Sequence, residues 1–271
     1  MAATAVADPF GDDPVEEVPL PGSPLVRALA QVRFPNLAAL STPSADATVG
    51  RIVEHLKDDY PIIGEQREAQ LVMTQEGVTQ TQGAKLWQMR SRDETWQVSL
   101  GGTFVALDTK AYTSRGDFAR RLEEILRSVS EELDPPYAER LGVRYTNRIE
   151  EPERVLRIQE LVRPEVLGGL AVPRPGDVAL AHTLTESLYT IGSRMLHVRW
   201  GLLPPNAQID PTLPAASSTS WILDLDSFVQ DRLDFDASAL AAAAERLASA
   251  AYRYFRWAVT EDFLKEFGGA A

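Results

Sequence analysis

The sequence predicts an α+β protein made of two similar antiparallel βββα halves, with long helices packed on one face of the sheet or sheets. Residues 86–149 contain three short strand patterns, a long amphipathic helix and a further strand. The order of three strands and a long helix returns at residues 180–258 with negligible identity. A meander covered by a helix is a stable way to bury the apolar face of such a sheet.

The first three strand patterns are marked by alternation and by a turn. Apolar and polar residues alternate from Trp87 onward and again over residues 96–100, as expected for half-buried strands. Gly101-Gly102 supplies the backbone freedom of a two-residue hairpin turn before the return strand at 104–108. The pattern therefore predicts an antiparallel meander.

A helix is predicted to follow this meander. Ser114 and Asp117 resemble a capping box, with Asp in place of Glu or Gln, and Pro135-Pro136 ends the helix. Apolar residues fall on one stripe, which we expect to be buried on a sheet. The stripe consists of Phe118, Leu122, Ile125, Leu126, Val129 and Leu133.

The rest of the chain divides at proline- and glycine-rich stretches. Residues 1–22 are rich in proline, alanine and acid, which predicts a disordered acidic tail ordered only by contact with a neighbour. Residues 23–271 are expected to form a single compact unit, with halves of about 23–150 and 176–271, because residues 134–179 contain no long flexible linker. The remaining predicted elements are a strand at 24–34, a helix at 47–60, a strand at 69–74, a loop or hairpin end at 75–84, strands at 180–191, 195–203 and 221–228, an exposed loop at 204–218, and a last helix from Ala237 past Trp257.

Composition limits the classes of function. The net charge of −12 disfavours nonspecific binding to nucleic acid or to an anionic membrane, which needs a positive field. No apolar run reaches the roughly 18 residues of a membrane span, and the acidic N-terminus does not resemble a secretory signal. The absence of cysteine excludes disulfides, thiolate nucleophiles and cysteine zinc sites. We therefore expect a cytoplasmic protein without membrane contacts.

Three passages together resemble a sporadically distributed family of uncharacterised bacterial proteins. The opening strand at 24–34 is similar to the family's first strand, and residues 96–118 are similar to its central meander and helix start. Residues 141–149 resemble the family's Gly-x-Arg-Tyr-x-Asn signature, and residues 255–261 also fit. The resemblance covers most of residues 24–263. It implies no catalytic or binding residue, because we associate no activity with the family.

A basic strand is the first candidate binding surface. Arg144 and Arg148 share one strand face, and guanidinium groups match phosphate oxygens bidentately. The alternative, which we favour, is that these arginines pair with carboxylates of neighbouring elements. We predict a central strand, with Val143 and Ile149 buried. The candidate binding residues are Arg140, Arg144, Tyr145, Asn147 and Arg148.

Metal and cofactor motifs are weak in this sequence. Asp224 and Asp226 share a strand face and offer hard oxygen ligands, but no third ligand stands at a supporting spacing. His182 and His197 lie on adjacent predicted strands without zinc-site spacing. The paired glycines form neither a P-loop nor a dinucleotide fingerprint. The sequence therefore predicts no metal site and no cofactor.

These observations favour a non-catalytic protein that acts by binding another protein, as an accessory or defence-associated bacterial factor, with homo-oligomerisation left open. The last helix is rich in alanine, so another element can approach it closely, and its candidate interface is Tyr252, Phe255 and Arg256. One alternative is an RNA- or nucleotide-binding protein that uses Arg144 and Arg148. Another is a metal-dependent hydrolase built on Asp224, Asp226 and His197.

Overall fold

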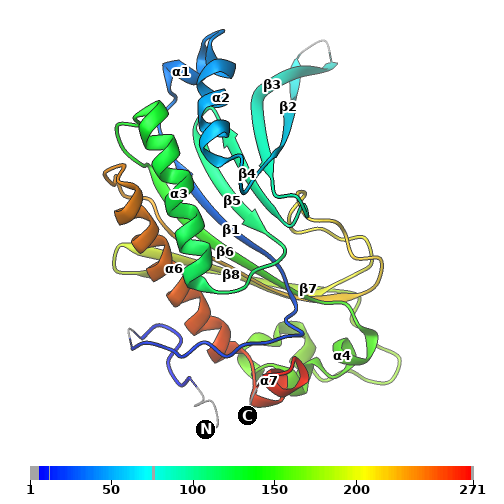
Figure 1. Cartoon of the computed structure of the whole chain (residues 1–271). Helices are drawn as coiled ribbons and strands as arrows, with labels where there is room; N and C mark the ends of the chain where they lie inside the picture. Colours follow the sequence, from blue (N-terminus) through cyan, green and yellow to red (C-terminus); the bar gives the residue numbers. More distant parts are fainter. Residues whose placement is uncertain (1–5, 12, 75–76, 270–271) are drawn as a thin grey trace. The chain divides into compact units, whose positions relative to one another are not determined.

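The computed structural model describes residues 6–11, 13–74 and 77–269 (Figure 1). The chain forms two compact units. Unit 1 contains residues 1–27, 144–228 and 246–271, and unit 2 contains residues 28–143 and 229–245. The unit boundaries therefore run through four regular elements, β1, β6, β9 and α6, whereas sequence analysis placed the division between residues 150 and 176.

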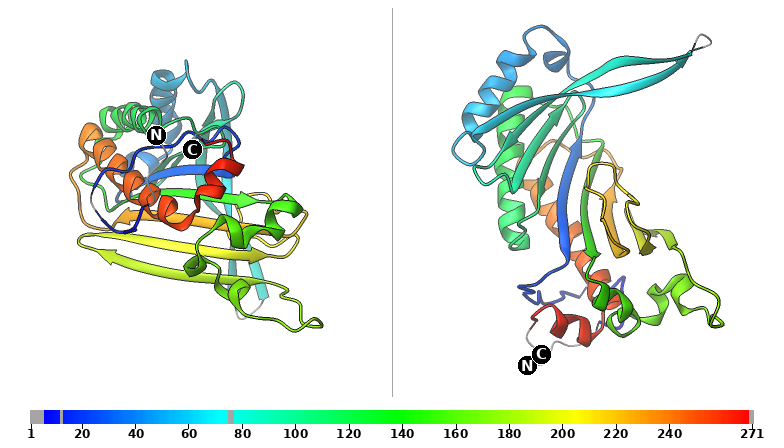
Figure 2. Two further views of the ribbon diagram at one scale, coloured as in Figure 1. Left: turned by 90° about the horizontal axis from the view of Figure 1, so that it is seen from below. Right: turned by 90° about the vertical axis from the view of Figure 1, so that its right-hand side faces the viewer.

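The fold is α+β, with a large antiparallel sheet whose strand order is β2-β3-β4-β5-β1-β6-β9-β8-β7 (Figures 1 and 2). The sixth position of β6 confirms the prediction that this strand lies inside the sheet. The strands are β1 (Leu25–Arg33), β2 (Ile62–Thr74), β3 (Gly77–Arg90), β4 (Trp96–Gly101), β5 (Phe104–Thr109), β6 (Arg140–Ile149), β7 (Thr183–Ile191), β8 (Arg194–Leu203) and β9 (Ser220–Val229).

Two long helices and several short ones accompany the strands. The long helices begin and end within a few residues of the predicted positions, as α3 and α6 show. The helices are α1 (Ala38–Ser41), α2 (Ala45–Leu56), α3 (Arg115–Leu133), α4 (Pro152–Leu156), α5 (Ile158–Leu161), α6 (Ala237–Ala258) and α7 (Glu261–Glu266), with 3-10 turns η1 (Pro164–Val166) and η2 (Gly168–Ala171).

The meander of unit 2 matches the predicted pattern. Strands β4 and β5 pair from Trp96↔Thr109 to Gly101↔Phe104, so the two-residue turn is Gly102-Thr103, one residue later than the predicted Gly101-Gly102 turn. Strand β2 is longer than predicted. Of the two alternatives for residues 75–84, a loop or the end of a hairpin, the structure agrees with the hairpin from residue 77 onward, because β3 begins there and pairs with β2. Residues 75 and 76 lie outside the described residues. Glutamine and threonine suit a two-stranded ribbon as well as a loop, so composition did not separate the two.

Helix α3 buries the predicted stripe. The Ser114 hydroxyl accepts a hydrogen bond from the Asp117 backbone N–H at 3.2 Å, which caps the first turn. Phe118 packs against Trp96 of β4, with the ring centroids 6.0 Å apart. The six apolar residues named above are all buried, and Leu122 is 0% exposed. The prediction that this stripe is buried is confirmed.

Unit 1 contains the β7–β8 hairpin and a long loop. The turn at Gly192-Ser193 joins Ile191 to its partner Arg194, as the sequence predicts, and Gly192 has a positive φ of 61°. Residues 204–219 contain no helix or strand. Sequence analysis expected this loop to be exposed, but Asp210, Leu213 and Ala216 are buried. The exposed loop is therefore wrong in part, because a buried carboxylate and apolar side chains anchor it.

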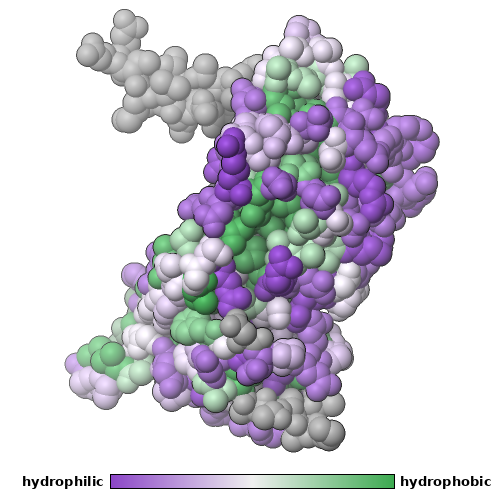
Figure 3. All heavy atoms as spheres, turned by 90° about the vertical axis from the view of Figure 1, so that its left-hand side faces the viewer, coloured by the Kyte–Doolittle hydropathy of each residue, from purple (hydrophilic) through white to green (hydrophobic). Residues whose placement is uncertain are grey.

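The surface combines apolar and hydrophilic residues. On the face drawn in Figure 3, a band of apolar residues is flanked on both sides by hydrophilic ones. Among the described residues, no helix has the length and apolar character needed to cross a membrane.

Candidate functional site

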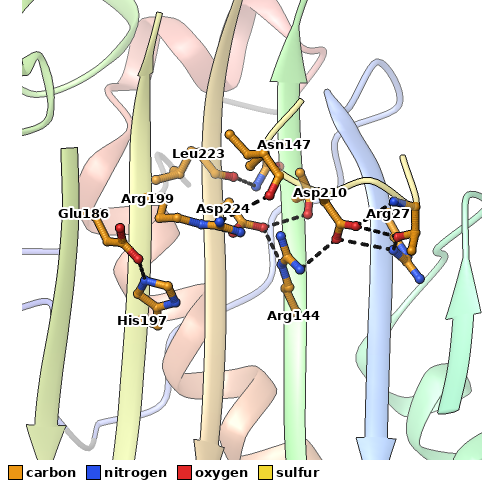
Figure 4. A network of polar contacts seen from close by, with 12 residues as sticks. Arg27, Arg144, Asn147, Glu186, His197, Arg199, Asp210, Leu223 and Asp224 are labelled. Carbon is orange, nitrogen blue, oxygen red and sulfur yellow. Dashed lines mark hydrogen bonds and ion pairs between the residues drawn. The ribbon is translucent and has the colours of Figure 1, made fainter. Parts of the chain in front are cut away.

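A buried ion cluster is centred on Asp224 of β9 (Figure 4). The Asp224 side chain is 1% exposed. Its Oδ1 accepts hydrogen bonds from Arg144 Nε and Thr146 Oγ1, both at 2.7 Å. Its Oδ2 accepts from Arg199 Nη2 at 2.7 Å and from Arg199 Nε at 3.0 Å. Both oxygens of this carboxylate are thus held by the neighbouring strands β6 and β8.

A second carboxylate, Asp210, joins the long loop to the same cluster. Its Oδ2 lies 2.8 Å from Arg144 Nη1 and 3.6 Å from Arg27 Nη1. Its Oδ1 accepts hydrogen bonds from the Thr212 backbone N–H at 2.9 Å and from the Thr212 hydroxyl at 2.6 Å. The loop is therefore fastened to β6 and β1 through one carboxylate.

The cluster shifts the pKa of two of its members, Asp210 and Arg144. Burial alone would raise the pKa of Asp210, but the bonds from Thr212 and the charges of Arg144 and Arg27 outweigh burial and lower it. Burial would lower the pKa of Arg144, but the charge and hydrogen bond of Asp224 outweigh burial and raise it. The charged forms are therefore the favoured ones in the folded protein.

The lowered pKa of Asp210 predicts an acid-sensitive contribution to stability. A carboxyl whose folded pKa lies below its unfolded value of about 3.9 stabilises the protein above that value. The contribution is lost as the pH falls through the folded pKa. We expect Asp210→Asn to lower the free energy of unfolding at pH 7, with the difference from wild type shrinking below about pH 4. Urea unfolding across this pH range measures it, and a difference that grows at low pH contradicts it.

The candidate residues of the predicted basic strand make different contacts in the structure. Arg144 belongs to the ion cluster, and Arg148 Nε lies 2.6 Å from Glu150 Oε1. Both arginines thus meet a carboxylate, which is the alternative that sequence analysis favoured. Asn147 donates to the Leu223 carbonyl at 3.2 Å. Tyr145 is 9% exposed, and Arg140 belongs to unit 2 whereas the other four belong to unit 1.

Three cluster residues were missed by sequence reasoning. Arg199 interrupts an apolar strand pattern, which is a signal for a buried partner, but Arg27 and Asp210 show no local signal. The cluster combines residues from four strands, β1, β6, β8 and β9, with Asp210 of the loop between β8 and β9. Only the folded chain brings them together.

The positions of the candidate metal ligands give little support to the metal-dependent hydrolase alternative. The arginines and Thr146 already occupy both oxygens of Asp224. His197 contacts Glu186 and stands opposite Leu188 of β7. His182 directly precedes β7 and is six residues, or about 20 Å along an extended chain, from Leu188. The two histidines are therefore not brought together. Within the described ranges, no group of three or more histidine, aspartate or glutamate side chains is placed to hold a metal ion.

A second candidate site lies where the N-terminal segment, defined as residues 6–11 and 13–18, meets helix α6. Arg253 Nη1 donates to the Asp8 carbonyl at 3.0 Å, and its Nη2 donates to the Asp13 carbonyl. Arg256 Nη1 donates to the Glu16 carbonyl at 3.3 Å. The main chain of the segment, rather than its acidic side chains, accepts these bonds.

Two further side chains complete this contact. Arg163 donates to the Val6 carbonyl at 3.0 Å and lies over the Trp257 ring at 5.7 Å. The Tyr252 hydroxyl accepts from the Val18 backbone N–H at 2.7 Å. We call Arg163, Tyr252, Arg253 and Arg256 the α6 surface.

An aromatic contact anchors the beginning of the segment. The ring centroid of Phe10 lies 4.8 Å from Tyr189 of β7 and 6.1 Å from Tyr254 of α6. Burial, together with the neighbouring Tyr189, raises the pKa of Tyr254, so its phenol stays neutral. An apolar anchor thus accompanies the polar contacts made by the arginines.

The predicted interface on the last helix is placed within this contact. Tyr252 and Arg256 hold the N-terminal segment, whereas Phe255 is 8% exposed and packs on Phe263 at 5.6 Å. Sequence analysis missed Arg253 and Arg163. It also assigned residues 1–22 to a disordered tail and did not predict these contacts. The described part of that tail contains no strand, but it is hydrogen-bonded to the same chain.

A comparison with known proteins found no matching family model and no curated protein with significant similarity to the chain.

Proposed function

We propose that the protein is a non-catalytic binding protein that acts through protein–protein interaction, and that the α6 surface binds an extended segment of its partner. One observation carries the proposal. Three arginines of this surface hold an acidic segment, whose described residues form no helix or strand, by four backbone carbonyls, those of Val6, Asp8, Asp13 and Glu16. In the chain alone, the N-terminal segment would then occupy the α6 surface, to which the partner segment binds.

The chemistry of the contact supports a peptide as the ligand. Guanidinium groups that bind carbonyls recognise the course of a main chain and place few demands on its side chains. Arg253 and Arg256 are 8% and 4% exposed with the N-terminal segment in place, so the contact shields both side chains from water. Acidic side chains on an incoming segment would add long-range attraction to this basic surface. We therefore expect an extended acidic segment as the preferred partner.

A direct test separates the segment from its surface. We expect a variant lacking residues 2–18 to bind a fluorescent peptide of residues 6–18, as followed by anisotropy. Arg253→Ala and Arg256→Ala in the shortened chain should weaken this binding at least about tenfold, since each charged hydrogen bond contributes roughly 1.5–3 kcal/mol. Circular dichroism checks that the shortened chain is folded. Equal binding by the arginine variants, or no binding by a folded shortened chain, contradicts the proposal.

The full-length chain offers a second prediction. Arg253→Ala removes the donors to the Asp8 and Asp13 carbonyls, so the N-terminal segment should exchange amide hydrogens faster than in wild type. The matched control is Arg246→Ala, because Arg246 is exposed on the same helix. Hydrogen exchange read by mass spectrometry measures the effect. An unchanged segment in Arg253→Ala would show that the arginine does not hold it.

We further infer an internal duplication and a cytoplasmic location for this binding protein. The order β3-β4-β5-α3 returns as β7-β8-β9-α6, which supports two βββα halves that arose from one pattern. The absence of cysteine suits a reducing compartment. Fractionation of the source cells tests the location.

A further inference from the structure

The last strand of the sheet, β7, presents a free edge. It ends the strand order, and among the described residues it pairs with β8 alone (Figure 2). The turn Ile191-Gly192-Ser193-Arg194 makes Ile191 and Arg194 a hydrogen-bonded pair. Because the bonding direction alternates along a strand, odd-numbered residues of β7 bond to β8 and even-numbered residues face outward. Leu184, Glu186, Leu188 and Thr190 therefore direct their backbone groups to the outer edge.

Strand β7 has one charged side chain, Glu186, but lacks several other usual protections of an edge strand. Proteins blunt an exposed edge with proline, lysine, bulges or short strands. Strand β7 has nine residues without proline or lysine, and it pairs with β8 without a register shift. Among the described residues, the outward backbone groups of β7 make no backbone hydrogen bond to another segment. Leu184 and Leu188 are 44% and 58% exposed, which is unusual for leucine.

We propose that β7 pairs antiparallel with β7 of a second copy of this chain, which makes the protein a homodimer with one sheet continued across the two subunits. A two-fold axis at Ser187 gives full overlap of the nine residues. Glu186 then stands opposite Leu188 of the second copy, and Leu184 stands opposite Thr190. A two-fold axis at Glu186 would instead place two like charges directly opposite each other.

The two-fold arrangement explains why we expect the strand that pairs with β7 to come from a second copy of the same chain. The two Leu188 side chains become diagonal neighbours, which lie within reach of long side chains. Their mutual burial removes apolar surface that the single copy leaves exposed. The contact is isologous and uses up the same edge on both copies, so assembly through β7 stops at two. It does not involve the α6 surface and stands independently of the proposed function.

Cysteine cross-linking tests the register. The chain has no cysteine, so Ser187→Cys introduces the only thiol. Ser187 would form a non-hydrogen-bonded pair with itself, with Cα atoms about 4.5 Å apart, within the range of about 4.4–6.8 Å for disulfides. The matched control is Thr190→Cys on the same strand, whose copies would be about 20 Å apart. Mild oxidation should convert most Ser187→Cys, and little Thr190→Cys, to disulfide dimers on non-reducing gels. Equal cross-linking overturns the proposal.

Mass measurement in solution tests the dimer itself. Light scattering coupled to size exclusion should give twice the chain mass for wild type, and a monomer across a dilution series overturns the proposal. Leu188→Pro removes one outward N–H that β8 does not use, so the variant should be a folded monomer. Leu188→Glu keeps the N–H and places a carboxylate directly opposite Glu186 of the second copy on both sides of the axis, so it should also be monomeric. A folded variant of either kind that remains fully dimeric overturns the proposal.

Discussion

Asp224→Ala is expected to lower the free energy of unfolding by about 3–5 kcal/mol, because it leaves two buried arginines without their shared carboxylate. Asp224 is 1% exposed, and the side chains of Arg144 and Arg199 are 19% and 18% exposed. Their positive charges would then lie close together with little water to solvate them. Urea unfolding followed by circular dichroism measures the loss.

Two further variants test whether the loss of unfolding free energy comes from the buried charge pairing. Asp224→Asn keeps the size of the side chain but removes its charge, so its effect should fall between those of wild type and Asp224→Ala. Glu186→Ala removes an exposed carboxylate, 60% accessible, that contacts His197 of β8. Its effect should stay below about 1 kcal/mol, as for surface ion pairs. If Asp224→Ala costs no more than Glu186→Ala, the cluster does not stabilise the fold.

Leu122→Ala is expected to destabilise the protein by about 2–5 kcal/mol through loss of apolar contacts and the cavity that remains. Leu122 is 0% exposed in the middle of the buried stripe of α3. Alanine is the better helix former, so the loss comes from packing and not from helix propensity. Thermal and urea unfolding should both report it.

The control for Leu122 lies on the opposite side of the same helix. Arg127 is 58% exposed and pairs with Glu123 one turn earlier, at 2.7 Å. Arg127→Ala should therefore change the free energy of unfolding by no more than about 0.5 kcal/mol. A Leu122→Ala loss below about 1 kcal/mol would show that the site relaxes to fill the cavity.

The positions of several elements followed from the sequence, because each one depends on neighbours a few residues away. The paired glycines located the β4–β5 turn to within one residue, and the capping residues together with Pro135 bounded α3. The alternation along residues 142–149 separated Val143 and Ile149, both 0% exposed, from the ion-paired Arg144. Periodicity, caps and turns are local properties, so they can be read in one dimension.

The ion cluster depended on tertiary structure. Arg27, Arg144 and Arg199 each carried a charge that local sequence did not assign to a partner. Asp210 is 66 residues from Arg144, and Asp224 is 80 residues from it. Partner choice in a sheet follows strand order and the course of loops, and neither is encoded within a short window of sequence.

For the N-terminal segment too, composition predicted one property and tertiary structure decided another. Its acidic and proline-rich sequence predicted an unstructured tail, and the described residues indeed form no helix or strand. The partners that hold it, such as Arg253 for the Asp8 carbonyl, lie 245 residues away. A backbone carbonyl has the same chemistry in every residue, so no sequence pattern marks it as a ligand. The sequence alone determined that the segment lacks its own regular structure, and only the folded chain decided where its main chain finds donors.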